Sequence, residues 1–436
     1  MIFKIQSTTE KLESVAGLVL AGEIARSCGL QNILEKEKSL TNALVSMFGL
    51  LVQGRSTFEE IDLFRRNSFF KTAFDLSFVP AQETLRLYLE KIARNPEIQN
   101  AVHLCSTAIL KKTKITPLEV EGRKYIPVDI DVSVMDNSDS KKEGVGKTYM
   151  LVDGYAPIFS YIGTEGYMLD CELRPGSQHC QKGTPEFLGS NIKTLEDLNL
   201  SDPFLFRLDG GNDGIETMIP LIGKNRFFLV KRNLRKESRE AWLDCAQALG
   251  TKLIVRPGKT VYTGSVTRKH PKADQSMGEF DIVFQVTERT IDREGNDLLF
   301  PDIEVETWWT NLFESAEDII ALYHNHGTCE QFHSELKSDM GVERLPSGKF
   351  RVNSLLLKVA MLAFNTLRLI GQRSLEKTAL LPMKVEAKRK RLRKVISDIM
   401  NIGCKFVRHG HCLFLRISST NPWLPVFREL YSGLQV

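Results

Sequence analysis

The stretch "YIPVDIDVSV", residues 125–134, marks the point where the hydrophobic pattern of the chain changes from a helical period to a period of two. In a strand, successive side chains point to opposite faces of the sheet. This alternation separates the polar residues Asp129, Asp131 and Ser133 from the aliphatic residues Val128, Ile130 and Val132. Acidic side chains in such an apolar strand are costly unless they are paired or bind a cation. The stretch therefore predicts a strand whose acidic face has a partner.

The segments that follow predict the rest of a sheet. Both "KTYMLVDGYAPIFSYIG" (147–163) and "EGYMLDCELRPG" (165–176) are β-rich, so the first three strands are expected to form an antiparallel meander. Next come a helix at 184–200, a strand at 204–211, a short helix at 215–223 and a strand at 226–233. Three strands followed by an αβαβ order is the layout of an RNase-H-like domain. We therefore predict an α/β fold with a mixed five-stranded sheet and helices on both faces.

The regions on either side of this core have different patterns. Before residue 115 the apolar positions recur at helical spacing, and Pro80 precedes a strongly helical stretch, "AQETLRLYLEKIARN". After Asn233 a helix and several β-rich stretches interrupt the core, and a long amphipathic helix follows Phe350. The predicted organisation has five parts: a helical N-terminal region (1–115), the first part of the core domain (116–233), a β-rich insertion (234–305), the second part of the core domain (306–350) and a basic helical C-terminal region (351–436).

Charge is distributed unevenly along the 436 residues, although the net charge is only +4. Residues 338–436 carry 18 Lys and Arg against 6 Asp and Glu, which leaves 40 against 48 for residues 1–337. A basic C-terminal quarter predicts a polyanionic partner. Apolar runs are broken well before the ~20 residues that a membrane helix needs, and the start of the chain does not resemble a secretory signal. Eight cysteines without a C-x-x-C pair are typical of a reducing cytoplasm.

The stretch "YHNHGTCEQFHSELKSD", residues 323–339, gathers polar side chains at steps of three and four. On a helix this spacing predicts one shared face, formed by Tyr323, His326, Glu330, His333 and Lys337. Gly327 weakens a helix by about 1 kcal/mol relative to Ala. The helix is therefore expected to begin near Thr328, with Tyr323 and His326 on a preceding turn.

Three acidic residues are predicted to converge. Asp209 ends the apolar strand "FLFRLDGG", and Asp131 lies on the first strand, which neighbours the fourth strand in the predicted order. Glu330 would approach them from the late helix. Three carboxylates in one place repel one another, and divalent cations such as Mg²⁺ would relieve the repulsion. Two such ions about 4 Å apart are typical of phosphodiester chemistry.

Two other motifs are weaker. "KKEGVGKTY" (141–149) ends like a phosphate-binding loop, but Lys141 occupies the first glycine position and no strand–loop–helix context surrounds it. "CKFVRHGHC" (404–412) has Cys and His residues, yet its spacing matches no common zinc site. We interpret the first as a turn and the second as part of a strand-rich hairpin.

The chain resembles bacterial insertion-sequence transposases of the DDE type, in the group with a Tyr-x2-Arg-x3-Glu-x6-Lys signature. Tyr323, Glu330 and Lys337 lie at the family spacing, with His326 where Arg is usual. The blocks "GSQHCQKGTPEFL", "FRLDGGND" and "ERLPSGKF" are similar to this family and occur in its order. The resemblance implies a catalytic, metal-binding triad of Asp131, Asp209 and Glu330, with Asp129 as the alternative first member, and two Mg²⁺ ions that Mn²⁺ can replace.

The same resemblance implies partners and further roles. It implies cleavage at terminal inverted repeats, joining of the 3′-OH ends to target DNA, a homodimer in the synaptic complex, and a bacterial, nucleoid-associated location. Residues expected to contact DNA are Tyr323, His326, Lys337, Lys349, Arg351, Lys231, Arg232, Gln82 and Arg86, together with the basic run 388–394. Trp308 and Trp309 are candidates for stacking on a flipped base. Two alternatives remain: a transposase-derived DNA-binding protein without cleavage, and an RNase-H-like nuclease or resolvase.

Overall fold

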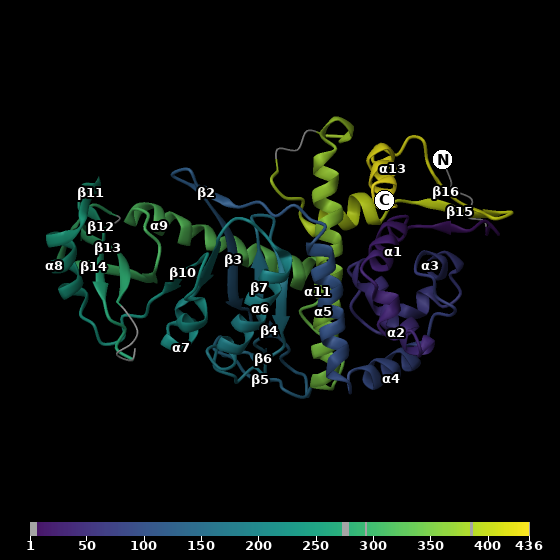
Figure 1. Ribbon diagram of the computed structural model, residues 1–436, viewed down its shortest axis with the longest axis horizontal. Coiled ribbons are helices and arrows are strands. Elements are labelled where there is room, and N and C mark those ends of the chain that lie inside the picture. Colours follow the sequence, from purple (N-terminus) through teal and green to yellow (C-terminus); the bar gives the residue numbers. More distant parts are fainter. Residues whose placement is uncertain (1–6, 273–278, 293, 384–386, 436) are drawn as a thin grey trace.

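A computed structural model describes residues 7–272, 279–292, 294–383 and 387–435. Its centre is a mixed sheet in which five strands have the order β10-β9-β3-β7-β8 (Figure 1). The bounds are Arg123–Val132 for β3, Ile158–Ile162 for β7, Tyr167–Glu172 for β8, Phe204–Leu208 for β9 and Arg226–Lys231 for β10. β3, β7 and β8 pair antiparallel, whereas β3 with β9 and β9 with β10 pair parallel. The expected meander and the expected pairing of the first and fourth strands are both present.

The insertion extends this sheet instead of forming a separate one. Helix α8 (Arg239–Leu249) precedes four antiparallel strands: β11 (Thr251–Arg256), β12 (Lys259–Arg268), β13 (Phe280–Ile291) and β14 (Asp297–Thr310). β14 pairs antiparallel with β10, so the strands continue the core sheet outward. For this reason β14 continues five residues beyond the expected end of the insertion at 305. β11 was not anticipated from the sequence.

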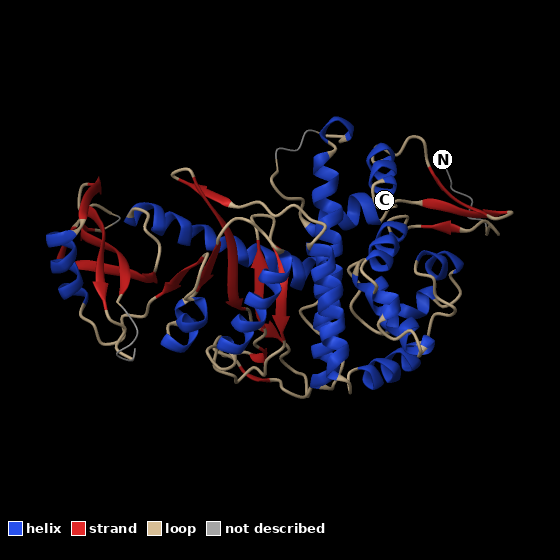
Figure 2. Cartoon of the chain, viewed as in Figure 1, coloured by secondary structure: helices blue, strands red, loops and turns tan. Residues whose placement is uncertain are grey.

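Helices surround the other end of the sheet. The N-terminal region contains α1 (Leu18–Ser27), α2 (Lys38–Leu51), α3 (Ser68–Ala73), α4 (Gln82–Ile92) and α5 (Pro96–Leu110), and α6 (Thr184–Leu198) and α7 (Ile215–Met218) connect the later core strands. Helix α11 (Phe350–Glu376) contacts α2, α5 and β8 and so joins the N-terminal helices to the sheet. Figure 2 shows this division, with helices gathered near the chain ends and strands elsewhere.

The two ends of the chain meet in a small sheet. β1 (Leu12–Glu13) pairs with β15 (Cys404–His409), which forms a hairpin with β16 (Cys412–Ile417). Helices α12 (Leu392–Val395) and α13 (Leu424–Ser432) belong to the same C-terminal part. The strand-like interpretation of "CKFVRHGHC" is therefore confirmed, and the N- and C-terminal regions pack as one unit.

Helix α11 is the one helix in the described part of the chain that is long and apolar enough to cross a membrane. In its most apolar window, 89% of the residues are buried inside the protein. Such burial is typical of a core helix, which agrees with the expectation that the chain has no membrane span.

A second small sheet lies just beyond the end of β3. It consists of β4 (Met135–Asp136), β6 (Asp153–Tyr155) and β5 (Gly146–Lys147). Lys147, from the stretch that resembles a phosphate-binding loop, lies on β5 and its Nζ is 3.3 Å from the Asp153 carboxylate. The segment is a turn between short strands, as expected.

Candidate active site

Parallel pairing of β3 with β9 brings Asp131 next to Asp209. The last residues in register are Ile130 and Leu208, and the two aspartates are the next residue on each strand. Asp209 then leads into a turn of 3₁₀-helix at 210–212, where the Asn212 amide donates a hydrogen bond of 2.7 Å to its carboxylate. A side chain at Gly211 would come within 3.2 Å of that carboxylate. The turn therefore requires glycine for this close approach.

The two carboxylates have opposite pKa shifts. Burial and the negative charge of Asp131 raise the pKa of Asp209. Burial also opposes ionisation of Asp131, but the His333 hydrogen bond and the charges of His333 and His326 lower the pKa of Asp131 overall. The pair is thus held close together at an electrostatic cost, which a bound cation would relieve.

Asp129, the alternative first member of the triad, is already paired. The Arg207 guanidinium donates hydrogen bonds of 2.6 and 2.7 Å to its two carboxylate oxygens, and His326 Nδ1 is 2.9 Å from one of them. Arg207 also donates to the Leu322 carbonyl. Burial opposes the charge on Asp129, but Arg207 and His326 lower the pKa of Asp129 below its usual value. The Asp129 carboxylate is 2% exposed and has little room for a metal ion.

The signature segment is not one continuous α-helix. Helix α9 (Ala316–His324) is followed by a 3₁₀ turn (Asn325–Gly327), helix α10 (Thr328–Ser334) and a π-helical turn (Glu335–Asp339). The expected start near Thr328 is confirmed. The changes of pitch divide the expected polar face, because 3₁₀ and π turns rotate side chains differently from an α-helix.

The members of that expected face therefore have different surroundings. Tyr323 is half-buried, and its ring packs 5.5 Å from Trp308 and 5.7 Å from His326. Burial raises the pKa of Tyr323, and the charges of Asp209 and Asp131 raise it further. Lys337 donates a hydrogen bond to the Val134 carbonyl. Burial lowers the pKa of Lys337, although the charges of Glu343 and Asp131 oppose that shift.

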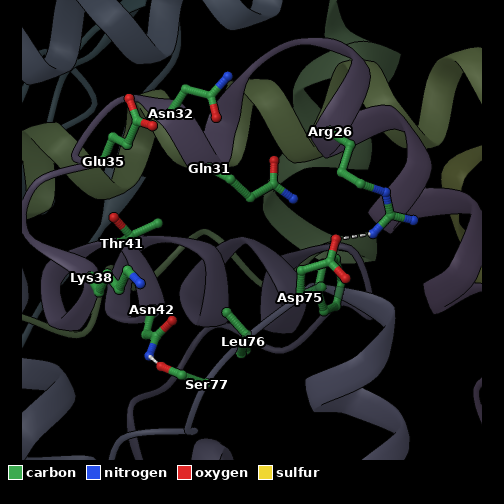
Figure 3. A pocket seen from close by; sticks show the side chains of 11 residues that line it. Arg26, Gln31, Asn32, Glu35, Lys38, Thr41, Asn42, Asp75, Leu76 and Ser77 are labelled. Carbon is green, nitrogen blue, oxygen red and sulfur yellow. Dashed lines mark hydrogen bonds and ion pairs between the residues drawn. The ribbon is translucent and has the colours of Figure 1, made fainter.

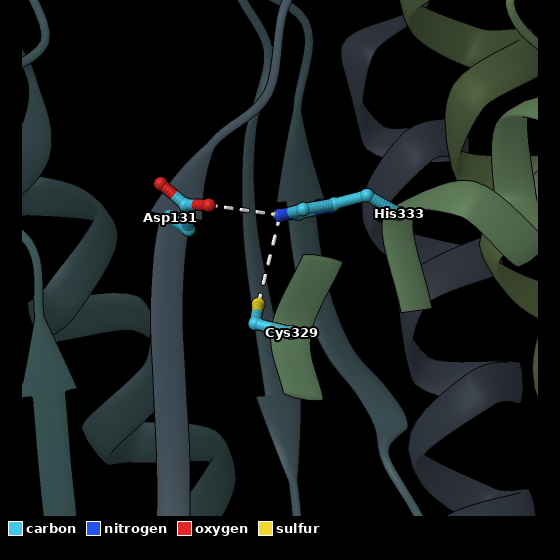
Figure 4. Close-up of side chains that lie close together, drawn as sticks. All are labelled: Asp131, Cys329 and His333. Atoms are coloured by element: carbon cyan, nitrogen blue, oxygen red, sulfur yellow. Dashed lines mark hydrogen bonds and ion pairs between the residues drawn. The ribbon is translucent and has the colours of Figure 1, made fainter. Parts of the chain in front are cut away.

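Glu330 is exposed on α10 and makes no hydrogen bond or ion pair with any other described residue. The residues of this segment that meet Asp131 are instead His333 and Cys329 (Figure 4). His333 Nε2 is 3.1 Å from Asp131 and 3.6 Å from the Cys329 sulfur. Neither contact was expected from the sequence, since the predicted face placed His333 beside Glu330 and assigned Cys329 to the core.

Tyr149 is a further neighbour of the two carboxylates that sequence reasoning missed. Its hydroxyl donates a 3.2 Å hydrogen bond to the Val132 carbonyl at the end of β3. Burial raises the pKa of Tyr149 to about 12, and the charges of Asp131 and Asp209 contribute. The phenol therefore stays neutral at physiological pH and can donate hydrogen bonds.

Several residues expected to contact DNA have partners within the protein. The intramolecular pairs are Lys231 with Glu306, Arg232 with Glu237, Gln82 with Glu59, Arg86 with Glu83, and Lys349 with Glu90. His326, bound to Asp129, is 8% exposed. Arg351 is exposed and makes no ion pair with any described residue. Among these side chains Arg351 is the most available to a polyanion in this conformation.

The basic run 388–394 folds back onto the signature segment. Arg391 and Arg393 form ion pairs with Asp339, and Arg389 with Glu335. Lys388 and Lys394 are exposed. The run thus combines a structural role with two freely exposed positive charges.

Trp308 and Trp309 are buried, with 0% and 2% of their surfaces exposed. Trp308 packs against Tyr323, while Trp309 Nε1 donates a 3.1 Å hydrogen bond to Asp213. Neither ring has a face open to a base in this conformation. The expectation of base stacking is corrected accordingly: both indoles are core residues at the end of β14.

One hollow elsewhere in the protein is unrelated to the carboxylates. It has a volume of about 360 Å³ and lies among the N-terminal helices, where the Gln31 amide points into it (Figure 3). Its rim includes the Arg26–Asp75 ion pair and the Asn42–Ser77 hydrogen bond. None of its lining residues belongs to the carboxylate site.

Carboxylates at the ends of neighbouring strands define a metal-assisted, phosphodiester-cleaving class of site, and comparison with known proteins gives the family. The model of the family "Transposase DDE domain group 1" matches residues 3–436, so the chain belongs to that family. It is therefore a DNA transposase, an enzyme that cleaves DNA with divalent metal ions. A cryo-electron microscopy structure of the piggyBac transposase synaptic complex with hairpin DNA is 12% identical, with 87% of this chain and 78% of that chain covered and a TM-score of 0.43. No curated protein matches the chain.

Proposed function

We propose that the chain is the transposase of a bacterial insertion sequence, and that Asp131, Asp209 and Glu330 hold two divalent ions at its active site. The observation that carries this proposal is the pairing of β3 with β9. It places two carboxylates side by side with no arginine between them, one step beyond the neutralised Asp129–Arg207 pair. An RNase-H-like catalytic core is supported by the strand order β10-β9-β3-β7-β8.

The donor set fits a hard cation. Asp131 and Asp209 offer carboxylate oxygens, and the Asp131 side chain is 23% exposed, so an ion can reach it from solvent. Glu330 is exposed and free to bind from α10. Mg²⁺, with Mn²⁺ as a substitute, prefers such oxygen ligands. When bound, two ions would activate an attacking oxygen and stabilise the leaving one.

Other residues of the chain would position the DNA. The neutral phenols of Tyr149 and Tyr323 lie near both aspartates and can donate hydrogen bonds to phosphate oxygens. Lys337, held at the end of β3 by the Val134 carbonyl, adds a positive charge beside Asp131. His326 is engaged by Asp129, so its proposed part is to hold that carboxylate and thereby orient the segment.

We further propose that the protein binds the terminal inverted repeats of its element, cleaves them and joins the freed 3′-OH ends to target DNA as a homodimer. Gln82 and Arg86 on α4, and the exposed Arg351, Lys388 and Lys394, would supply the contacts. Arg86 and Gln82 would exchange their partners Glu83 and Glu59 for phosphate or base edges. Such contacts make binding fall steeply with salt.

The test is a cleavage and strand-transfer assay on the element's own ends with Mg²⁺ or Mn²⁺. Asp131→Asn, Asp209→Asn and Glu330→Gln should each bind DNA and fail to cut it. The matched controls are Asp197→Asn and Glu196→Gln, which change exposed carboxylates on α6. Near-normal cutting by Glu330→Gln would remove Glu330 from the triad.

Two outcomes would favour other functions. Binding of the ends without cleavage by the unaltered protein would indicate a transposase-derived DNA-binding protein. Cleavage without joining of 3′-OH ends to a target plasmid would indicate a nuclease or resolvase.

A further inference from the structure

We propose that Asp131, Cys329 and His333 form a second kind of metal site, one for a thiophilic ion such as Zn²⁺ or Cd²⁺, which shares Asp131 with the proposed Mg²⁺ site. Binding at this site depends only on the three side chains. Its effect on DNA cleavage rests on the proposed function.

The spacing of the three donor atoms fits a tetrahedral ion. His333 Nε2 is 3.6 Å from the Cys329 sulfur and 3.1 Å from the Asp131 carboxylate, and all three donors lie within 4.8 Å of one another. Zinc bonds of about 2.0–2.3 Å at tetrahedral angles separate neighbouring ligand atoms by roughly 3.4–3.6 Å. An ion can therefore enter between them with side-chain shifts of a few tenths of an ångström.

His333 is oriented for this purpose by the groups behind it. Its Nδ1 is 3.1 Å from the hydroxyl of the buried Tyr161, and its ring packs 5.2 Å from Phe159 and 5.4 Å from Tyr161. Metal-binding histidines typically have such a partner on the second ring nitrogen, which fixes the ring and the tautomer. Nε2 is thereby directed at Asp131 and Cys329, as Figure 4 shows.

The donor set selects the ion by softness. A thiolate and an imidazole favour Zn²⁺ and Cd²⁺, whereas Mg²⁺ takes oxygen ligands and would ignore Cys329 and His333. Binding forms a metal–sulfur bond and releases the Cys329 thiol proton to solvent, with no change of oxidation state. Cys329 and His333 are buried, so the ion would enter from the side of Asp131, which is partly exposed. The fourth position is left to water.

Sharing Asp131 has a consequence for the reaction. An ion held by Asp131, Cys329 and His333 occupies a carboxylate oxygen that the proposed Mg²⁺ site needs, and it adds a positive charge beside Asp209. Zn²⁺ should therefore inhibit cleavage in the presence of excess Mg²⁺. The inhibition should depend on the thiol of Cys329.

Binding can be tested without DNA by adding Co²⁺ to the metal-free, full-length protein. We expect the intense visible bands of tetrahedral cobalt and a cobalt–thiolate charge-transfer band, with one ion per chain. Both should be lost in Cys329→Ser and retained in Cys412→Ser, a control at the exposed cysteine of β16. Absence of the thiolate band in the unaltered protein, or its persistence in Cys329→Ser, would overturn the proposal.

A second measurement needs no variant and so does not depend on the folding of Cys329→Ser. X-ray absorption of the protein with one equivalent of Zn²⁺ should show one sulfur at about 2.3 Å and nitrogen or oxygen at about 2.0–2.2 Å. A first shell made only of nitrogen and oxygen would contradict a site at Cys329.

The inhibition is then measured by titrating Zn²⁺ into the Mg²⁺ reaction, with each protein normalised to its own zinc-free rate. Cys329→Ser should need at least ~10-fold more Zn²⁺ for half inhibition, which corresponds to about 1.4 kcal/mol in affinity. Equal inhibition of both proteins would contradict the shared use of Asp131. If the unaltered protein does not cut DNA at all, the proposed function fails, while the cobalt and zinc spectra still decide whether this site exists.

Discussion

Two pairs of side chains on the same two strands have opposite electrostatics. Asp129 on β3 faces Arg207 on β9, and the pair is buried with two hydrogen bonds between opposite charges. Two residues further along the same face, Asp131 meets Asp209, a second carboxylate, where the strands end. The backbone is nearly the same in both places, and only the residue that β9 supplies differs.

The difference separates a structural role from a functional one. A buried carboxylate with a bidentate arginine is neutralised and holds two strands and the 322–326 segment together. A carboxylate that faces another carboxylate gains no stability from its neighbour and persists for another reason. The adjacent positions therefore predict opposite consequences for the same substitution.

The largest contrast should appear in activity. Asp209→Asn should reduce cleavage by at least ~10³-fold, about 4 kcal/mol in activation free energy, because the amide cannot replace a charged metal ligand. Asp129→Asn should keep measurable cleavage at a temperature where it remains folded. A single-turnover assay on pre-cut and intact ends measures both. Equal loss of activity in the two folded variants would mean that Asp129 also takes part in catalysis.

Stability should respond most strongly at Arg207. Arg207→Met leaves the Asp129 charge buried with only His326 as partner, and should lower the free energy of unfolding by about 3–5 kcal/mol. The control is Arg289→Met, which removes ion pairs to Asp302 and Glu304 on the exposed insertion strands and should cost about 1 kcal/mol or less. Urea unfolding followed by circular dichroism gives both values. If Arg207→Met costs no more than Arg289→Met, the buried pair does not have the structural role described here.

Metal binding should stabilise one member of the comparison only. At ten times its dissociation constant, Mn²⁺ should raise the free energy of unfolding by about 1.4 kcal/mol in the unaltered protein. The gain should disappear in Asp209→Asn and remain in Asp129→Asn. Thermal unfolding with and without Mn²⁺ measures it, with Asp197→Asn as the control. A gain that survives in Asp209→Asn would place the ion elsewhere.

The smallest expected effect is a difference in pH dependence. The pKa of Asp129 is lowered on folding, so its stabilising contribution is complete above the ordinary carboxyl pKa of about 3.9 and is lost as the pH falls through the folded value. The pKa of Asp209 is raised on folding, so its ionisation costs stability once the pH exceeds the ordinary value. Relative to the unaltered protein, Asp129→Asn should therefore lose stability, and metal-free Asp209→Asn should gain it, between about pH 4 and pH 7. Unfolding curves across this range would contradict the assignment if the two differences had the same sign.

Much of this arrangement was predictable from the sequence. Alternation in residues 125–134 and the strand–helix order after 184 predict that the first and fourth strands pair, and this pairing alone places Asp131 beside Asp209. The role of Arg207 was not predictable, because it depends on the exact register between strands that lie 75 residues apart. A shift of one position would have placed Arg207 on the other side of the sheet.

The helical spacing of residues 323–337 was a poorer guide. It assumed a constant pitch, whereas the segment changes from α to 3₁₀ to α to π. His326 therefore meets Asp129, and Cys329 and His333 meet Asp131, while Glu330 is exposed. Trp308 and Trp309 were misjudged for a related reason: β14 was expected to end near 305, but it pairs with β10 through Thr310 and buries both rings.

The most direct test of the central claim is a crystal structure of the protein soaked in Mn²⁺, with the ions located by anomalous scattering. The carboxylate pair should give a peak between the Asp131 and Asp209 oxygens, within about 2.5 Å of both, and no peak at Asp129. Saturating Mn²⁺ that left the Asp131–Asp209 position empty, or that bound at Asp129, would contradict it.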